Sequence, residues 1–238
     1  MRLERVDCKL DFLLERFALV RDDVAFIHND KEYSYGWLLD SIKNYGSFLR
    51  ENKVCPGEIV MVISDYSPQA FSLLGALMLN KNIMVPLTKE SVVEIETTVE
   101  LSECSRIIRF SEDFNEVFIE SKERIVENEI LVNFLKKGEA GILLFSSGST
   151  GKPKGILIDF GIMLKKFEVV RNKTRAISFL MFDHFGGINT IFHILSSLGV
   201  VITVPNRSIE GICSAVERHR VELLPTTPSF LKLLVRSS

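Results

Sequence analysis

The chain has 238 residues, of which 46% are hydrophobic and 25% charged, and its formal net charge at pH 7 is −2. This composition is that of a globular protein with a sizeable core, and it carries no electrostatic footprint for nucleic acid. The charged N-terminus lacks the apolar core of a signal peptide. The longest apolar stretch, "AFSLLGALML", covers only about half of a membrane span. We therefore expect a soluble, cytoplasmic protein with neither a nucleic-acid nor a membrane partner.

In the first half of the chain, predicted helices and strands alternate. Ser34 is a plausible N-cap for the second helix, and Ser67-Pro68 opens the third. Pro86 is expected to end the third strand. Residues 111–129 are charged and ambiguous, so no state is assigned to them. Helices are expected over residues 10–17, 33–52, 69–80 and 91–103, and strands over 24–28, 59–64, 82–87 and 106–110.

The same alternation restarts after residue 139. A short helix over 129–137 stops at Gly138, and Ser208 caps a later helix. Strands are expected over 140–145, 155–159, 175–182, 200–205 and 221–226, and helices over 160–172, 186–199, 208–220 and 228–237. The pattern predicts an α/β fold of layered, largely parallel sheets with flanking helices. We expect two α/β portions, residues 1–138 and 139–238, with the boundary somewhere in 111–138.

The segment "SSGSTGKPKG", residues 146–155, lies between two predicted strands. Its glycines let backbone N–H groups approach an anion closely, its hydroxyl groups add hydrogen-bond donors, and its lysines add positive charge. A plain flexible linker is the alternative, because glycine and serine dominate linkers too. A linker has no reason to place two lysines and a proline between buried strands. The composition therefore favours a loop that binds phosphate groups.

This loop differs from the common nucleotide-binding loops. A Walker loop needs glycine where Ser146 stands and a hydroxyl residue where Pro153 follows Lys152. The missing hydroxyl also speaks against a kinase-like phosphate-transfer enzyme. A Walker loop runs into a helix, whereas "GILID" after this loop is an extended pattern. We therefore predict a loop that connects two strands.

The stretch "LLFSSGSTGKPKGILI" resembles the phosphate-loop signature of the adenylate-forming (AMP-binding) superfamily. That superfamily includes acyl-CoA synthetases, acyl-AMP ligases and the adenylation domains of peptide synthetases. Three further stretches resemble its motifs in the same order, namely "LLGALMLNKNIMVPLT", "FLMFDHFGGI" and "VELLPTTPSFLKLL". The strong motifs lie within residues 140–230, and the first hundred residues match in pattern only.

The resemblance implies an AMP-forming acid–thiol ligase. Such enzymes use ATP and Mg²⁺ to activate a small carboxylic acid as an acyl-adenylate. The acyl group then passes to coenzyme A or to the pantetheine of an acyl carrier protein. Lys154 would add positive charge at the β- and γ-phosphates, and Thr150 would contact the metal. The residues that the resemblance assigns to the phosphates are Ser146, Ser147, Gly148, Ser149, Thr150 and Gly151.

The resemblance places the acid substrate at "FDHFGG". His184 is the candidate catalytic residue, and the candidate substrate-binding residues are Phe182, Asp183, His184, Gly186 and Gly187. The two glycines would let the acid approach a helix N-terminus, where the helix dipole favours an anion. The alternative is that Asp183 caps this helix and His184 packs.

Other histidines are assigned no role in the chemistry. We expect His193 in the core or at an interface, and His28 and His219 in solvent.

The later superfamily motifs are not found in this chain. Among them are a Tyr-Gly-x-Thr-Glu segment, an aspartate for the ribose hydroxyls and a lysine on a mobile C-terminal domain. We therefore expect the N-terminal portion of the fold, inactive by itself. A non-catalytic binding module that uses the same fold is the alternative hypothesis.

Overall fold

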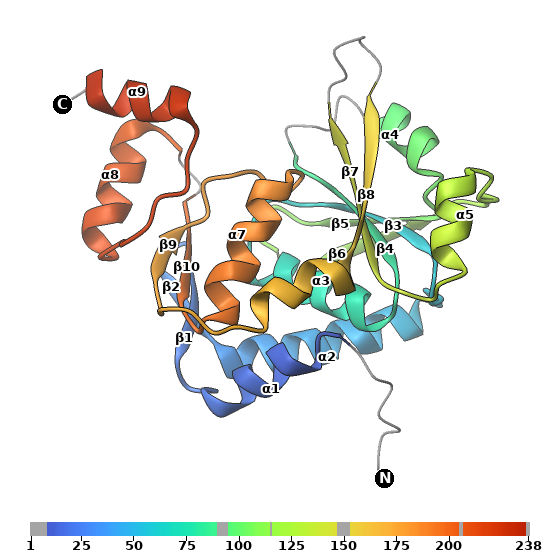
Figure 1. Ribbon diagram of the computed structural model, residues 1–238, viewed down its shortest axis with the longest axis horizontal. Helices are drawn as coiled ribbons and strands as arrows, with labels where there is room; N and C mark the ends of the chain where they lie inside the picture. The colour runs from blue at the N-terminus through green and yellow to red at the C-terminus, as the bar shows by residue number, and fades with distance from the viewer. Residues whose placement is uncertain (1–8, 90–94, 115, 147–152, 205–206, 237–238) are drawn as a thin grey trace.

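A computed structural model describes residues 9–89, 95–114, 116–146, 153–204 and 207–236. In these residues the strands form two sheets, and helices pack between and around them (Figure 1). The helices are α1 (Asp11–Leu19), α2 (Tyr35–Glu51), α3 (Pro68–Leu79), α4 (Ile95–Ser102), α5 (Glu129–Leu135), α6 (Phe160–Leu164), the 3₁₀ turn η2 (Lys165–Phe167), α7 (Phe185–Ser196), α8 (Ile209–Arg218) and α9 (Pro228–Arg236). The predicted α/β class is confirmed.

The larger sheet has six strands in the order β6-β5-β3-β4-β7-β8. The four central strands are parallel to one another, and each edge strand is antiparallel to the central strand beside it. The central strands are β3 (Ile59–Ile63), β4 (Ile83–Leu87), β5 (Arg106–Phe110) and β7 (Gly141–Ser146), and the edges are β6 (Val117–Ser121) and β8 (Lys154–Asp159).

Strand β3 shows why the central strands read as continuous apolar runs. Val60 and Val62 pack into the main core with α2 and α3. The alternate residues Ile59, Met61 and Ile63 pack on the other face of the sheet, against α4 and α5. All five residues of β3 are buried because both faces of the sheet are covered.

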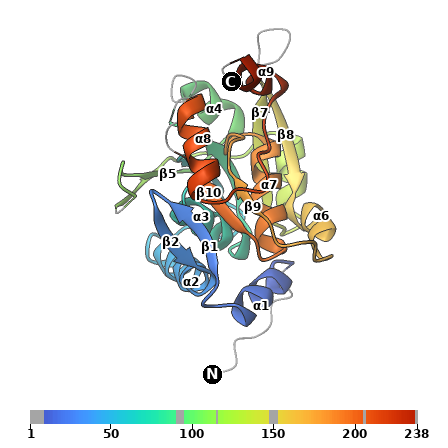
Figure 2. The same cartoon turned by 90° about the vertical axis from the view of Figure 1, so that its left-hand side faces the viewer.

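The smaller sheet has the order β2-β1-β10-β9. Its strands are β2 (Lys31–Ser34), β1 (Val24–His28), β10 (Val200–Thr203) and β9 (Arg175–Ile177). Helix α8 covers its outer face through Ile212 and Ala215 (Figure 2). The inner face meets the main core, where Phe26 of β1, Phe71 of α3 and Phe192 of α7 form a chain of ring contacts at 5.8 and 5.6 Å. This aromatic chain fixes α7 between the sheets (Figure 1).

The predicted caps Ser34 and Ser208 are confirmed, and Ser67, which was expected to open α3 with Pro68, is also a cap. The hydroxyl oxygens of Ser34, Ser67 and Ser208 accept backbone N–H groups at 3.1, 3.0 and 3.1 Å, at the starts of α2, α3 and α8. Such caps satisfy donors that a helix N-terminus leaves unpaired. They fix where each helix begins.

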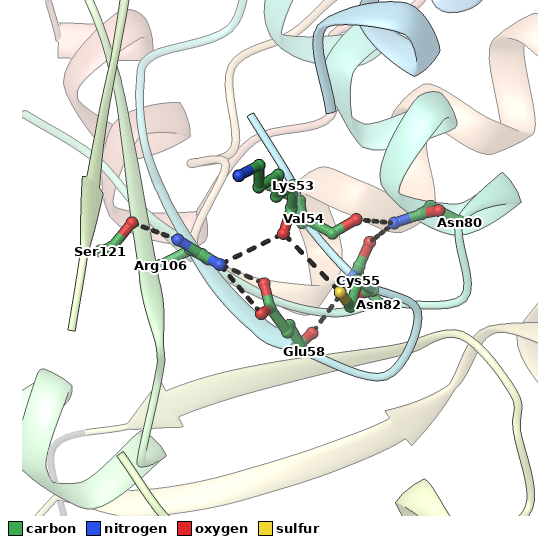
Figure 3. Close-up of polar contacts among 8 residues, drawn as sticks. All are labelled: Lys53, Val54, Cys55, Glu58, Asn80, Asn82, Arg106 and Ser121. Atoms are coloured by element: carbon green, nitrogen blue, oxygen red, sulfur yellow. Dashed lines mark hydrogen bonds and ion pairs between the residues drawn. The ribbon is translucent and has the colours of Figure 1, made fainter. Parts of the chain in front are cut away.

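A buried amide group and a partly buried guanidinium group hold the amino-terminal ends of the central strands together (Figure 3). Asn82, 1% exposed, donates to the carbonyls of Cys55 and Glu58 at 2.9 and 3.0 Å and accepts from Asn80 at 2.9 Å. Arg106 of β5 donates to both carboxylate oxygens of Glu58, at 2.9 and 3.2 Å. The carboxyl-terminal ends of these parallel strands lie at the opposite end of the sheet from this network.

Several sequence expectations are wrong in detail. Residues 175–182 and 221–226 were expected as full strands, but only β9 forms, and Leu223 makes a single bridge with Ala176. The predicted helix over 160–172 is reduced to α6 and η2, and strand β2 was missed. Strand β4 continues past Pro86, because β7 pairs only with the first two residues of β4 and no ladder partner needs the N–H that proline lacks.

The division predicted at residue 138 follows chain order, whereas both sheets combine strands from either side of that position. Strand β10 pairs with β1, and β7 pairs with β4. Within the described residues, no helix is both long and apolar enough to cross a bilayer.

Candidate functional site

The glycine-rich segment is held between β7 and β8. These strands pair antiparallel from Gly141↔Asp159 to Ser146↔Lys154, which confirms a loop that connects two strands. Ser146 and Lys154 are therefore direct partners, and both are exposed. The remaining predicted phosphate ligands, Ser147, Gly148, Ser149, Thr150 and Gly151, lie outside the described residues. Their phosphate contacts, and the metal contact of Thr150, stay predictions.

Lys154 fits the role of a cation for a polyanion. It begins β8, so its backbone is fixed by the ladder with β7. No carboxylate of the described residues forms an ion pair with it. An exposed ammonium without a protein counter-ion at the base of the loop is available to an anionic ligand.

The second predicted site lies at the start of α7. His184 is the N-cap residue by backbone geometry, and its side chain makes no capping hydrogen bond. Its Nδ1 lies 2.6 Å from Oδ1 of Asp183. An ionised carboxylate only accepts hydrogen bonds, so Nδ1 carries the proton and Nε2 is the nitrogen left for a ligand. The two side chains differ in exposure, at 69% for His184 and 11% for Asp183. His184 therefore does not pack as the alternative expects, and the N-cap position of α7 belongs to His184 and not to Asp183.

Residues from the larger sheet support this pair. Thr88, which follows β4, donates to Oδ2 of Asp183 at 3.4 Å. Tyr66, which follows β3, donates to the carbonyl of Met181 at 3.3 Å. Burial raises the pKa of the Tyr66 hydroxyl, and the nearby Asp183 charge raises it further. The ring of Tyr66 meets Phe182 edge to face at 5.3 Å.

The structure gives Phe182 and Gly187 packing roles. Phe182 is 1% exposed and belongs to the core. A Cβ on Gly187 would lie 2.0 Å from the Met181 carbonyl and 2.1 Å from the Tyr66 hydroxyl, so protein atoms already fill that space. Gly186 is less constrained, since its Cβ would meet only Leu180 Cδ1, at 3.0 Å. Substrate approach over these glycines stays a prediction.

A cavity of about 370 Å³ lies where the carboxyl ends of strands from both sheets meet. Lys89 and Arg207 bring positive charge to its wall, and Asp65 and Glu112 bring negative charge. The Ser178 hydroxyl is buried there without a hydrogen-bond partner among the described residues. A buried polar group of this kind is satisfied by water or by a ligand.

The expectation that His28 lies in solvent is wrong, because it lines this cavity at 7% exposure. Its Nδ1 lies 2.6 Å from the Thr203 hydroxyl, and its Nε2 faces the Asn29 amide at 3.3 Å. The Asn29 amide is a donor, so Nε2 accepts and Nδ1 donates. Burial lowers the pKa of His28. The ring is therefore a fixed, neutral part of the cavity wall.

Sequence reasoning missed Tyr66, Thr88, Lys89 and Arg207. A usable signal was present, because Tyr66 and Lys89 follow predicted parallel strands directly, and ligands of such sheets bind beyond the carboxyl ends of strands. Arg207 had no comparable signal, because its position depends on how the smaller sheet packs. In the described part of the chain, no cluster of three or more His, Cys, Asp or Glu residues has the arrangement of a metal site.

Comparison with known proteins links these features to a family. A family model described as AMP-binding enzyme matches residues 14–238. The 2-succinylbenzoate–CoA ligase of Bacillus pumilus is 20% identical over 94% of this chain and 50% of its own length. Nonribosomal peptide synthetase 1 of Aspergillus fumigatus is 24% identical over 97% of this chain and 4% of its own length.

Solved structures share the fold. The o-succinylbenzoate CoA synthetase of Bacillus subtilis, in complex with its acyl-adenylate intermediate, has a TM-score of 0.76 at 20% identity, covering 96% of this chain and 64% of that chain. The N-terminal subdomain of Klebsiella oxytoca NpsA, in complex with anthranilyl-AMSN, has a TM-score of 0.78 at 20% identity, covering 96% and 63%. This chain thus spans half the length of the curated CoA ligases that it matches.

Proposed function

This chain belongs to the AMP-binding enzyme family, and we propose that it supplies part of a site that activates a carboxylic acid with ATP as an acyl-adenylate. The observation that carries the proposal is the β7–β8 pair. These two paired strands lie at either end of "SSGSTGKPKG", and their register places Lys154 opposite Ser146. This arrangement lies within the span that the family model matches.

The reaction joins two anions, so its main obstacle is charge repulsion. An oxygen of the carboxylate attacks the α-phosphorus of ATP, so that a bond forms between this oxygen and the phosphorus. The bond from the α-phosphorus to the oxygen that bridges to the β-phosphorus breaks, and pyrophosphate leaves with its electrons. Fixed donors and cations stabilise the charge that builds up on the leaving phosphates. In our proposal Lys154 and Ser146 act on those phosphates, together with Ser147 to Gly151. Mg²⁺, contacted by Thr150, would neutralise phosphate charge when bound.

We assign His184 to the acid. Its Nδ1 proton is held by Asp183, so its ring orientation is set before any substrate binds. Nε2 of His184 then faces the acid, and it donates a hydrogen bond to the reacting carboxylate when it carries a proton as well as Nδ1. The first turn of α7 adds the positive end of a helix dipole, which favours an anion. Thr88 acts through Asp183 as a positioning residue.

We further propose that a thiol displaces AMP to give a thioester. The sulfur attacks the acyl carbon, and AMP leaves. In our proposal Lys89 and Arg207, which line the cavity together with Asp65 and Glu112, meet the phosphate groups of a phosphorylated thiol, and the Ser178 hydroxyl, which has no hydrogen-bond partner among the described residues, adds a donor. The relatives include both a CoA ligase and peptide synthetases. Coenzyme A and a carrier-protein pantetheine are therefore both candidate acceptors. We place this chemistry in the cytoplasm.

The test is acid-dependent exchange of radiolabelled pyrophosphate into ATP, run with a panel of carboxylic acids. It uses the polypeptide as its gene encodes it, alongside the isolated 238-residue chain. We expect the isolated chain to show little exchange, since it spans half of the curated CoA ligases. Exchange by neither form with any acid would favour the alternative, a binding module that uses the same fold.

Lys154→Ala tests the phosphate role directly. Loss of one charge-assisted contact to a phosphate should lower the exchange rate about tenfold or more. Lys165→Ala is the matched control, because Lys165 is an exposed lysine of η2 outside the loop. Equal rates for Lys154→Ala and Lys165→Ala would remove the proposed role of Lys154.

A further inference from the structure

The face of α7 next to His184 carries a lysine whose contacts differ from those of an ordinary surface lysine. Lys166 of η2 reaches across the first turns of α7. Its ammonium donates to Oδ1 of Asn189 and lies 4.9 Å from the ring centroid of Phe185 and 5.0 Å from that of Phe167. Phe185 and Asn189 are one helical turn apart, so they share a face of α7.

The Lys166 ammonium lacks an anionic partner within the described residues, where no carboxylate forms an ion pair with it. The two rings replace part of its water, and this desolvation lowers its pKa. Amide and aromatic contacts offset only part of the lost hydration. An anionic group of a ligand beside the ammonium would offset the rest of the lost hydration.

Two cations lie near this face of α7. His193 lies one turn beyond Asn189, and burial lowers its pKa, which the charges of Arg171 and Lys166 lower further. The ring of Phe185 remains 44% exposed beside the ammonium. An exposed aromatic surface next to an unpaired cation suits a ligand with an apolar body and a distal negative charge.

We propose that Lys166 is a specificity-determining residue that binds a second anionic group of the acid substrate, with the Phe185 ring against the body of that acid. The chain would thus select dicarboxylic acids, or acids with an equivalent second anion, over simple monocarboxylic acids. This inference rests on the proposed function, because it takes the reacting carboxylate to lie at His184. Consecutive residues lie about 100° apart around a helix axis, so one small acid would curve around the start of α7 from His184 to Phe185.

The experiment measures kcat/KM for pyrophosphate exchange with matched acids, using the polypeptide as its gene encodes it. The probes are the dicarboxylic acids from glutaric to suberic, and isophthalic acid, each paired with the monocarboxylic acid of the same carbon skeleton. We expect the unaltered protein to prefer at least one diacid over its partner. Lys166→Met keeps the length of the side chain and removes its charge. It should lower kcat/KM for that diacid at least tenfold and change that for the monoacid less than twofold.

Two further variants separate this role from a structural one. Lys165→Met removes the neighbouring exposed charge and should leave the preference unchanged. Asn189→Asp supplies a carboxylate to Lys166 from within the protein, so it should abolish the preference although the lysine is retained. Exchange with monoacids and diacids alike, unaffected by Lys166→Met, would overturn this inference and leave the proposed function intact. Exchange with no acid would overturn the proposed function and this inference together.

Discussion

Gly187→Ala probes how the segment before α7 is held in place. A methyl group there would lie 2.0 Å from the Met181 carbonyl, 2.1 Å from the Tyr66 hydroxyl and 2.8 Å from the Leu180 carbonyl. Two of these atoms are backbone, and Tyr66 is only 5% exposed. None of the three can move aside as the end of a flexible side chain would. The loop before α7 must therefore shift if the methyl group is to fit.

The magnitude follows from two opposing effects. Replacing glycine with alanine in a helix stabilises it by about 0.5–1 kcal/mol. Forcing a methyl group into a filled space costs about 1–3 kcal/mol, and more where backbone must move. Because backbone must move here, the upper end of that cost applies, and we expect a net loss of about 2 kcal/mol or more in the free energy of unfolding. The matched control is Gly186→Ala, whose methyl would meet only the flexible end of Leu180, at 3.0 Å. That variant should stay within about 0.5 kcal/mol of the parent.

Urea denaturation of the 238-residue chain, followed by circular dichroism, measures both differences. Tyr66→Phe removes one of the three clashing atoms, so the double variant with Gly187→Ala should recover part of the loss. If Gly187→Ala unfolds at the same urea concentration as Gly186→Ala, the close packing around Gly187 is refuted. Preserved stability together with lost acid-dependent exchange would instead support the original expectation, that these glycines admit the substrate.

Two further predictions concern buried polar groups. Asn82→Ala removes three hydrogen bonds and leaves two backbone carbonyls without their donor (Figure 3). It should lower the free energy of unfolding, measured in urea, by about 2–4 kcal/mol. Asn172→Ala, at an exposed asparagine, is the control, and equal losses in the two variants would contradict the reasoning. Burial lowers the pKa of His28, so the folded chain binds this proton less readily than the unfolded chain. The stability that neutral His28 contributes is present above about pH 6.5 and lost as the pH falls below it. His28→Gln should therefore lose less stability than the parent between about pH 7.5 and 5.5, and parallel losses would exclude this role.

Local sequence signals determined much of the fold. The capping serines, Gly138 after α5 and the apolar runs of β1, β3, β4 and β5 depend on neighbours in the chain, so their meaning could be read directly. The same holds for "SSGSTGKPKG", whose exit pattern predicted a strand, and β8 is that strand. These features follow from backbone geometry and side-chain periodicity within a few residues.

The length of the shorter strands was decided by distant partners. β2 is a strand because it pairs with β1, and residues 178–182 are not because the ladder of β9 with β10 ends at Ile177. An apolar run shows that a segment is buried, but it does not show how long a partner strand lies beside it. Such errors fall where the ladder depends on chain far away in sequence.

The sequence by itself singled out "SSGSTGKPKG" as a candidate phosphate loop, and Asp183 and His184 as candidate substrate-binding residues, because each is a compact motif of adjacent residues. Only the tertiary structure set Thr88 against Asp183, filled the space over Gly187 with Tyr66 and Met181, and laid the Lys166 ammonium on the ring of Phe185. These contacts join residues 19 to 121 positions apart, as the numbering of each pair shows, except for Met181 and Gly187. The physical reason is that packing brings such groups together. A one-dimensional pattern records what each residue can do, whereas the folded chain decides which partner it meets.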